Sequence, residues 1–425
     1  MNSTKPLKSE KFKVVSLFSG AMGLDLGLEA TGHFETLACV EKVPAFCATI
    51  RHNRDRGRVE CKDLRVYEGD ISTRAPESVM SDLGLQPGEL DLLVGGPPCQ
   101  TFSTAGRRQS VQDPRGTMLW QFLRFVQVFQ PKFFLMENVR GLLSAALRHR
   151  PIKERPEHGG PPLTEEEEPG SVVKLFLEDL AAKKLDYRLD CFEVNAVNYG
   201  APQLRERAIF IGNRMGHVVE FPLPTHGTLP SLLPLRTLGD VIKEIQDPQP
   251  VILDFSPRKK SFLAQVPAGG NWRCLPPHVA EESMGGAFFA KGGRSGWWRR
   301  LSHDLPSPTI MTMPNHASTS LCHPDEVRAL TVRECAAVQE FPPEWEFLGK
   351  ASEQYAQVGN AVPTRLGQVA GALIASQLRD LETHPSIGTS APRFRVVYVQ
   401  SHVRTRHWFK GGLAVVRDDK TTVQP

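Results

Sequence analysis

The segment from Phe12 to Glu41 constrains the fold more than any other part of the sequence. It contains an apolar stretch of strand length over 14–18, a glycine-containing turn over 19–23, a helical stretch to Ala30 and a second apolar stretch over 34–40. A strand that leads through a short turn into a helix, and then into another strand, is typical of a βαβ unit with parallel strands. The sequence therefore predicts an α/β protein.

The same alternation continues along the chain. Further strand-like runs cover 90–94, 133–136 and 208–211, and segments of helix length cover 119–129 and 172–184. With 425 residues, 40% of them hydrophobic, the chain can bury a large core. We expect a doubly wound, largely parallel sheet, whose ligands bind at the carboxyl ends of its strands.

The rest of the chain divides by composition. Residues 150–170 contain several Pro and Gly residues and four consecutive glutamates, which predicts a solvated loop. The βα rhythm fades after Gly212, resumes over 331–340, and ends in an amphipathic helix over 364–381. We therefore predict a large domain (1–220), a smaller irregular domain (221–329), a return to the large domain (330–384) and a C-terminal extension (385–425). The extension contains an alternating stretch, 393–399, that predicts a strand pair of undetermined role.

Composition excludes several protein classes. The N-terminal residues are polar and the following apolar run is short, so neither a signal peptide nor a membrane span is expected. Eight cysteines are scattered without a Cys-x-x-Cys pair, which indicates neither a zinc site nor a disulfide framework and predicts a reducing, cytoplasmic setting. The net charge of +4 permits a polyanionic partner but does not require one.

Two acidic residues and a glycine turn suggest a nucleoside site. Gly20 and Gly23 follow the first strand, and Glu41 lies about 20 residues on, where an acid can accept hydrogen bonds from ribose hydroxyls. The spacing is not Gly-x-Gly-x-x-Gly, which argues against a pyrophosphate-containing dinucleotide. Asp70 follows another strand and could accept from an adenine amino group. An ordinary tight turn and a helix-capping Asp remain open as alternatives for these residues.

The stretch Gly95-Gly96-Pro97-Pro98-Cys99-Gln100 is the most informative one. Two glycines and two prolines specify a rigid loop directly after a buried strand, and this loop presents a thiol. Thiolates are strong nucleophiles when their pKa is lowered or a base lies near. Most cysteines are inert core residues, but Cys99 in such a loop is a poor core filler and is a candidate nucleophile.

Two further groups of polar residues adjoin predicted strands. Glu137 ends the apolar run 133–136, and partial burial would suit its carboxyl to hold or deliver a proton. Gln203, Arg205 and Arg207 alternate just before the run 208–211, which places them on one face and predicts anionic or polar partners. A helix-capping role for Glu137 and a surface salt-bridge ladder for the arginines are the alternatives.

Taken together, the ordered motifs resemble those of the DNA (cytosine-5)-methyltransferase family. The matching blocks cover most of residues 14–380; they are Leu17-Phe18-Ser19-Gly20, Gly69-Asp70-Ile71, Pro97-Pro98-Cys99-Gln100, Met136-Glu137-Asn138-Val139, Gln203-x-Arg205-x-Arg207, Leu330-Thr331-Val332-Arg333-Glu334-Cys335 and Gln357-Val358-Gly359-Asn360-Ala361-Val362-Pro363. The resemblance implies a Rossmann-like methyltransferase domain with a smaller target-recognition domain.

The resemblance also implies a reaction. Cys99 would attack carbon 6 of a flipped cytosine, Glu137 would stabilise protonation at N3, and Arg207, with Arg205, would bind the exocyclic oxygen or a phosphate. The methyl donor would be S-adenosyl-L-methionine, the product S-adenosyl-L-homocysteine, and no metal would take part. Residues expected around the cofactor are Phe18, Gly20, Gly23, Glu41, Asp70, Ile71, Pro98, Met118, Asn360, Ala361 and Val362. One departure is Lys42, which stands where many relatives have an aromatic residue.

Contacts to DNA are expected from two segments besides Gln203. The loop 101–116 follows the nucleophile and could close on DNA, which assigns Gln100, Ser103, Arg107 and Arg108 to the interface. The segment 291–300 mixes cations, glycines and aromatic residues, which suits phosphate contacts by Arg294, Arg299 and Arg300. The segment 304–310 resembles the stretch that opens the last part of the family's recognition region.

Three other functions are weighed against this one. An RNA cytosine methyltransferase would share the catalytic blocks, but the long stretch between Arg207 and Leu330 favours duplex DNA. A non-catalytic DNA-binding protein would not need Cys99, and a dinucleotide oxidoreductase would not need the Pro-Pro-Cys loop. We expect a stand-alone enzyme of bacterial or phage type that acts as a monomer on DNA, in the cytoplasm, with or without a cognate restriction endonuclease. The sequence does not determine its recognition site.

Overall fold

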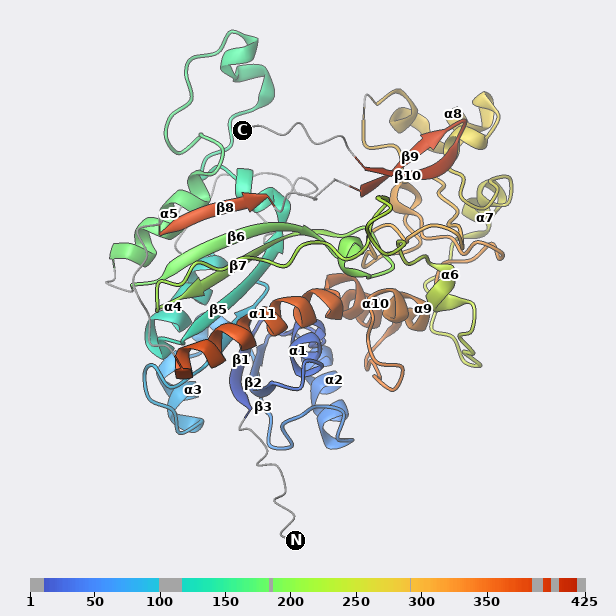
Figure 1. Cartoon of the computed structure of the whole chain (residues 1–425). Coiled ribbons are helices and arrows are strands. Elements are labelled where there is room, and N and C mark those ends of the chain that lie inside the picture. The colour runs from blue at the N-terminus through green and yellow to red at the C-terminus, as the bar shows by residue number, and fades with distance from the viewer. Residues whose placement is uncertain are drawn as a thin grey trace.

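A mixed eight-stranded sheet forms the centre of the protein (Figure 1). The structure is a computed structural model that describes residues 11–98, 117–182, 186–290, 292–383, 393–398 and 405–418. The strand order is β3-β2-β1-β4-β5-β7-β6-β8. The strands are β1 (Phe12–Leu17), β2 (Phe34–Glu41), β3 (Arg65–Glu68), β4 (Leu92–Gly95), β5 (Phe133–Val139), β6 (Arg188–Asn195), β7 (Glu206–Asn213) and β8 (Phe394–Tyr398).

The sheet confirms the predicted α/β architecture. Strands β3, β2, β1, β4 and β5 run parallel, whereas β7 is antiparallel to both of its neighbours, β5 and β6. The chain order reverses beside β1, because β2 and β3 lie on one side of it and β4 and β5 on the other. Ligands of such sheets bind where the order reverses, at the carboxyl ends of the strands. Strand β6, which is buried along its whole length, had not been singled out by sequence periodicity.

Helices cover both faces of the sheet, as expected of a doubly wound fold (Figure 1). One face packs against α3, α4 and α5, and the opposite face packs against α1 and α11. Successive residues of β1 point to opposite faces of the sheet. Val15 packs in the cluster with α3, α4 and α5, and Val14 packs in the cluster with α1 and α11. The helices are α1 (Gly23–Glu29), α2 (Pro44–Asp55), α3 (Pro76–Asp82), α4 (Met118–Phe129), α5 (Ser171–Ala182), α9 (Val332–Val338), α10 (Ala351–Asn360) and α11 (Thr364–Thr383).

Glycines allow α1 and α11 to pack at very short range. A Cβ on Gly27 would lie 2.1 Å from the carbonyl oxygen of Thr364, and one on Gly367 would lie 2.4 Å from that of Leu24. Because no side chain fits at either position, the C-terminal part of the chain comes into direct contact with the first helix. This contact brings residues 360–363 close to the turn that follows β1.

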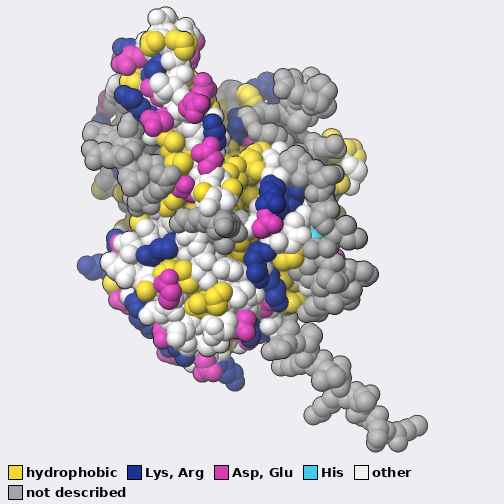
Figure 2. Space-filling view, turned by 90° about the vertical axis from the view of Figure 1, so that its left-hand side faces the viewer, with side chains coloured by type: hydrophobic (Ala, Val, Ile, Leu, Met, Phe, Trp, Pro, Cys, Tyr) yellow, Lys and Arg dark blue, Asp and Glu magenta, His cyan; other side chains and the backbone are white. Residues whose placement is uncertain are grey.

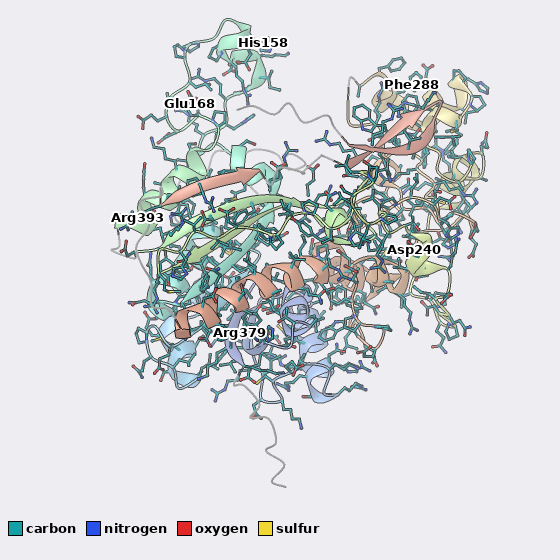
Figure 3. All side chains as sticks on the ribbon, in the orientation of Figure 1. His158, Glu168, Asp240, Phe288, Arg379 and Arg393 are labelled. Carbon is teal, nitrogen blue, oxygen red and sulfur yellow. The ribbon has the colours of Figure 1, made fainter. Side chains whose placement is uncertain are left out.

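Residues 221–329, which we call the recognition region after the resemblance noted in the sequence, contain a hydrophobic cluster of their own. Phe255, Leu263, Met284 and Trp298 belong to this cluster, which is separate from the two clusters that cover the sheet. Its short helices are α6 (Gly239–Ile242), α7 (Pro257–Leu263) and α8 (Pro277–Met284), and the rest is irregular chain. Figure 3 shows Phe288 at the outer end of this region, at the opposite side of the molecule from Arg393 and the central sheet.

An excursion over residues 140–170 projects from the sheet side of the molecule. Figure 2 shows basic and acidic side chains mixed on it, and His158 and Glu168 lie on it in Figure 3. Its residues are mostly exposed, which confirms the predicted solvated loop, and Arg150 pairs with Glu167 at its base at 2.5 Å. No part of it lines the cavity described below.

The C-terminal extension is built into the fold in two places, and the predicted strand pair over 393–399 is wrong. Strand β8 is a single strand that joins the central sheet parallel to β6, where Arg395 pairs with the fully buried Asp190 at 2.5 Å. A separate hairpin, β9 (Thr405–Lys410) and β10 (Leu413–Asp418), packs on the recognition region. There the amide of Ala414 donates to the Gly269 carbonyl at 2.8 Å. Residue pattern alone could not show which edge each strand would join.

Across the described part of the chain, no helix combines the length and apolar character needed to span a membrane.

Candidate active site

A cavity of about 710 Å³ lies at the carboxyl ends of β1, β2, β4 and β5. Its walls come from the turn after β1, the ends of β2, β4 and β5, the start of β7, the segment Thr309–Thr312 of the recognition region and the segment Gly359–Val362. This volume suits a nucleoside-sized ligand together with a second, smaller group. The strand ends thus bring together motifs that are far apart in the sequence.

The turn after β1 has a backbone that few residues adopt. Phe18 has a φ of 55°, Gly20 one of 57° and Met22 one of 65°, all in the left-handed region. A Cβ on Gly23 would lie 2.5 Å from the carbonyl oxygen of Val362. A strained backbone in a cavity wall is typical of ligand-binding turns. Gly23 therefore allows Val362, from the other end of the chain, to close this wall.

Glu41, at the end of β2, orders the floor of the cavity. Its two carboxylate oxygens accept from the amides of Gly20 and Val43, at 2.9 and 2.8 Å. Each oxygen has a further lone pair, so the carboxylate can also accept from the hydroxyls of a ribose. Only 8% of the residue is exposed, and it lines the cavity.

Asp70 lies beside Glu41 and pairs with Lys42. Its carboxylate accepts from Lys42 Nζ at 2.7 Å and from the Ser72 amide at 2.9 Å. The hydrogen bond from Lys42 is the main reason that the pKa of Asp70 lies well below its usual value. The helix-capping alternative is thus realised, since Asp70 caps a short 3-10 helix (Ile71–Thr73), and the residue also faces the cavity.

An aromatic residue is supplied from a position other than that of Lys42. Phe46, on the first turn of α2, is buried and lines the cavity. No sequence signal indicated Phe46 beyond its place shortly after Glu41. A ring at this position offers an apolar surface to a planar base.

A buried carboxyl group lies at the inner end of the cavity. Asp25, on α1, is 1% exposed and accepts from the Ser16 hydroxyl at 3.1 Å, while its Oδ1 has no hydrogen-bond partner among the described residues. Burial raises the pKa of Asp25 to about 7, and Glu29 adds to this effect. Nothing in the sequence pattern had indicated Asp25.

The end of β4 leads into the predicted nucleophile loop. A Cβ on Gly95 would lie 2.6 Å from the Leu17 carbonyl oxygen, and one on Gly96 would lie 3.1 Å from Glu137 Oε2. The Asn138 amide donates to the Pro97 carbonyl at 3.0 Å. The loop is therefore fixed up to Pro98, which lines the cavity. Cys99, Gln100, Ser103, Arg107 and Arg108 lie outside the described residues.

Glu137 and Arg207 form an ion pair in the cavity wall. Arg207 Nε contacts Glu137 Oε1, and the two side chains are only 12% and 11% exposed. Glu137 lies near the end of β5 and Arg207 near the start of β7. The antiparallel pairing of these two strands brings the two side chains together. The pair presents a carboxylate and a planar guanidinium to the cavity, which suits the recognition of a polar heterocycle.

The side chains of Arg205 and Gln203 form hydrogen bonds within the protein. Arg205 is 3% exposed and donates to the carbonyls of Ile310 and Gly359, both at 3.1 Å. Burial, with the charge of Arg207, lowers the pKa of Arg205. Gln203 is fully buried and donates to Gln339 Oε1 at 2.6 Å. The polar atoms of Gln203 are thus used inside the protein in this structure, and its contact with DNA remains a prediction.

The three arginines assigned to DNA in the recognition region also have internal partners. Arg294 donates to the Phe288 carbonyl and stacks over Trp272 at 5.0 Å. Arg299 donates to the Ser320 carbonyl at 3.2 Å, and burial lowers its pKa to about 10. Arg300 donates to three carbonyls, those of Val266, Pro324 and Asp325. All three arginines are partly exposed, and phosphate contacts by them remain a prediction.

Every cofactor residue predicted from the sequence lines the cavity. These are Phe18, Gly20, Gly23, Glu41, Asp70, Ile71, Pro98, Met118, Asn360, Ala361 and Val362, and Glu137, Arg205 and Arg207 line it too. The sequence analysis missed Ser16, Asp25, Phe46, Met311 and Thr312. The last two follow the segment 304–310, whose resemblance had pointed to the recognition region but not to the cavity wall.

The fold and the cavity define an α/β enzyme that holds a nucleoside cofactor at the carboxyl ends of its strands, next to a site for a second polar ring. The family model for C-5 cytosine-specific DNA methylases matches residues 12–375. The chain belongs to this family. It is a DNA (cytosine-5)-methyltransferase, and the family is S-adenosylmethionine-dependent.

Individual proteins agree with this assignment. The chain is 37% identical over 379 residues to the type II methyltransferase M.PspPI of Psychrobacter sp., covering 87% of this chain and 80% of the relative. It is 33% identical over 373 residues to M.Sau96I of Staphylococcus aureus, covering 87% and 77%. A crystal structure of an E. coli prophage protein, described as a DNA modification methyltransferase, matches with a TM-score of 0.55 at 22% identity, covering 88% of this chain and all of that one, which shows the shared fold.

Proposed function

We propose that this chain methylates carbon 5 of one cytosine within a specific duplex sequence, with Cys99 as the nucleophile. One observation carries the proposal: a single cavity runs from Gly20 and Glu41 to the ion pair of Glu137 and Arg207. The rigid Pro97-Pro98 segment opens at the same cavity and leads directly to Cys99.

The residues at the β1 and β2 ends fit S-adenosylmethionine. Glu41 offers acceptors for ribose hydroxyls, and Asp70 offers one for an adenine amino group. Phe46 and Ile71 supply apolar surface, and the exposed Asn360 supplies a polar group from the other wall. When bound, the cofactor supplies an activated methyl group on a sulfonium centre.

The protein's own residues would prepare the cytosine. The Cys99 thiolate forms a bond to carbon 6 and breaks the ring's conjugation, and electron density moves toward carbon 5. Glu137 stabilises a proton at N3, and Arg207 donates to the exocyclic oxygen, which favours this charge distribution. After methylation, a base or water removes the proton from carbon 5 and Cys99 leaves. No step of this sequence calls for a metal ion.

Arg205 acts as a positioning residue in this scheme. It joins Ile310 of the recognition region to Gly359 of α10 and so fixes two walls of the cavity. We retain the catalytic assignment only for Cys99, Glu137 and Arg207, since the Arg205 guanidinium is occupied by backbone carbonyls.

We further propose a bacterial restriction–modification setting. The similar type II methyltransferases come from bacteria. A cognate endonuclease would act separately, and the enzyme would work as a monomer in the cytoplasm. The loop 101–116, with Gln100, Ser103, Arg107 and Arg108, would close on the duplex once the target base has flipped.

The test is transfer of labelled methyl from S-adenosylmethionine to mixed-sequence duplex DNA and, in parallel, to RNA. We expect label only on DNA, at carbon 5 of cytosine, and none with Cys99→Ser. Labelling of RNA alone would refute the duplex substrate, and an active Cys99→Ser variant would refute the nucleophile. Binding of S-adenosylhomocysteine by Cys99→Ser serves as the control for folding.

A further inference from the structure

Two methionine side chains project beside the part of the cavity that the recognition region forms. Met311 is 39% exposed and Met313 is 55% exposed, whereas Thr312 between them is less exposed. Thr309, Ile310, Met311 and Thr312 all line the cavity. Met311 thus lines the cavity while part of its side chain is exposed, and the exposed Met313 follows two residues later.

The chain before these side chains is held firmly. The Arg205 guanidinium donates to the Ile310 carbonyl at 3.1 Å, and the Thr309 hydroxyl donates to the Leu204 carbonyl at 2.7 Å. The Ile310 amide donates to Gln203 Oε1 at 3.3 Å. A Cβ on Gly359 would lie 2.6 Å from the Met311 carbonyl carbon, so α10 packs directly against this backbone.

The chain after them is held as well. The Pro314 carbonyl accepts from the Leu321 amide at 3.0 Å, and the Asn315 side chain donates to the Asp254 carbonyl at 3.0 Å. Lys259 donates to the Asn315 carbonyl at 2.8 Å. The two methionines therefore stand on a backbone that is fixed on both sides, although their own side chains remain in water.

Apolar side chains that are exposed on a fixed backbone beside an active site are expected to be covered by a bound partner. A flipped cytosine leaves a gap in the duplex, and the flanking bases lose their stacking contacts. DNA-bending proteins insert apolar side chains, methionine among them, between base steps. The unbranched, polarizable methionine side chain adapts well to the flat face of a base.

We propose that Met311 and Met313 form an apolar wedge, which enters the duplex beside the target cytosine and packs against the bases that flank the vacated position. The wedge holds the base outside the helix and so favours its entry into the cavity. This inference rests on the proposed duplex substrate. It assigns a role to side chains that take no part in the chemistry at carbon 5 or carbon 6.

The test compares two substrates once the methylated sequence has been read by bisulfite sequencing of treated plasmid DNA. In the first, the target cytosine is paired with guanine; in the second, it lies opposite an abasic site and flips at low cost. For M311A/M313A we expect kcat/KM to fall about tenfold or more on the paired substrate and less than about threefold on the second. M311L/M313L should retain most of the activity, because leucine is a comparable wedge.

Two controls separate the wedge from other effects. Ile152→Ala removes a side chain that is 62% exposed on the excursion, away from the cavity, and should change neither substrate. Affinity for S-adenosylhomocysteine and the thermal unfolding temperature should be unchanged in all variants. An equal loss on both substrates, or no loss, would overturn the wedge while leaving the function intact. Absence of transfer by the wild-type enzyme to any duplex would overturn the proposed function itself.

Discussion

Arg207 on β7 forms an ion pair with Glu137 on β5, and about nine-tenths of each side chain is buried. The pair crosses two antiparallel strands, in a register that sets Val139 opposite Arg207. Asn138 of β5 donates to Pro97 in the loop that leads to Cys99, and Arg205, just before β7, donates to Ile310 of the recognition region. The ion pair therefore joins these two strands of the sheet and, in the proposed mechanism, contributes to the chemistry of the site.

The first prediction concerns this ion pair. Arg207→Ala leaves Glu137 buried without its partner, which should cost about 3–5 kcal/mol of the free energy of unfolding. Arg207→Ala with Glu137→Gln should recover a large part of that loss, because no unpaired charge remains. All of these variants should have methyl transfer reduced by about 10² or more. Urea unfolding and labelled methyl transfer measure the two effects; a double variant no more stable than Arg207→Ala would contradict the account.

The second prediction concerns Asp25. Its pKa is raised by burial from 3.8 in the unfolded chain to about 7 in the fold, so the folded state binds the proton more tightly. Between about pH 4 and pH 7 the unfolded chain ionises first, and stability falls as the pH rises; above pH 7 the penalty is constant. Asp25→Asn removes this penalty, which amounts to at most about 4 kcal/mol.

The measurement is urea unfolding of the wild type and Asp25→Asn at pH 5.5 and pH 8. The variant should gain stability relative to the wild type at the higher pH. Burial also raises the pKa of Glu29, on the next turn of α1, so Glu29→Gln should show a pH-dependent difference of the same sign. A difference between Asp25→Asn and wild type that does not change with pH would rule out the raised pKa.

The third prediction concerns Lys42. Its side chain is 71% exposed, and its pair with Asp70 is a surface pair that contributes no more than about 1 kcal/mol to stability. Lys42→Phe should place a ring at the cavity mouth and leave Asp70 free to accept from the ligand. Because aromatic contacts contribute about 0.5–1.5 kcal/mol, affinity for S-adenosylhomocysteine should rise by up to about tenfold.

Calorimetric titration checks the Lys42 variant. Lys62→Phe, at an exposed lysine that does not line the cavity, is the control and should bind as the wild type does. Unchanged or weaker binding by Lys42→Phe would mean that Phe46 already supplies the whole apolar surface for the base.

The fourth prediction concerns the C-terminal extension. Ending the chain after His384 removes β8 from the edge of β6 and removes the hairpin from Gly269. We expect a lower unfolding temperature and aggregation on warming, because a sheet edge with unpaired backbone groups becomes accessible. Thermal unfolding with light scattering measures both, and an extension without any role in stability would leave them unchanged.

A point variant separates the strand from the hairpin. Arg395→Ala removes one cation from the fully buried Asp190 and should cost about 1.5–3 kcal/mol, since hydrogen bonds to charged groups contribute this much. Arg417→Ala, on the exposed side of β10, should change stability by less than about 0.5 kcal/mol.

Some features of the site could be predicted because they depend on local pattern and on a general property of parallel sheets. Glu41, Asp70 and Glu137 each follow a strand, and neighbouring parallel strands end at one edge, so their clustering follows from the strand order. Asn360 lies far along the chain and was placed by resemblance to the family. The contact of Gly27 with Thr364 shows the physical means by which that segment returns.

Other features depend on partners that no local pattern specifies. Arg299 and Arg300 have the composition of a DNA-contacting segment, yet each also donates to backbone carbonyls of the same region. Gln203 alternates with Arg205 and Arg207 in the sequence, but burial against Gln339 decides its role.

The sequence by itself determined the α/β class, the places of Gly20, Glu41 and Asp70 after strands and the Gly-Pro loop before Cys99, because strand periodicity, turn residues and motif spacing are local. The other residues expected around the cofactor followed from the resemblance to the family. Only the tertiary structure decided the burial of Asp25, the aromatic surface of Phe46, the fixed methionines at the rim and the two docking places of the C-terminal extension. Burial and pairing of this kind arise between segments distant in the chain, and their free energy depends on the whole packed arrangement.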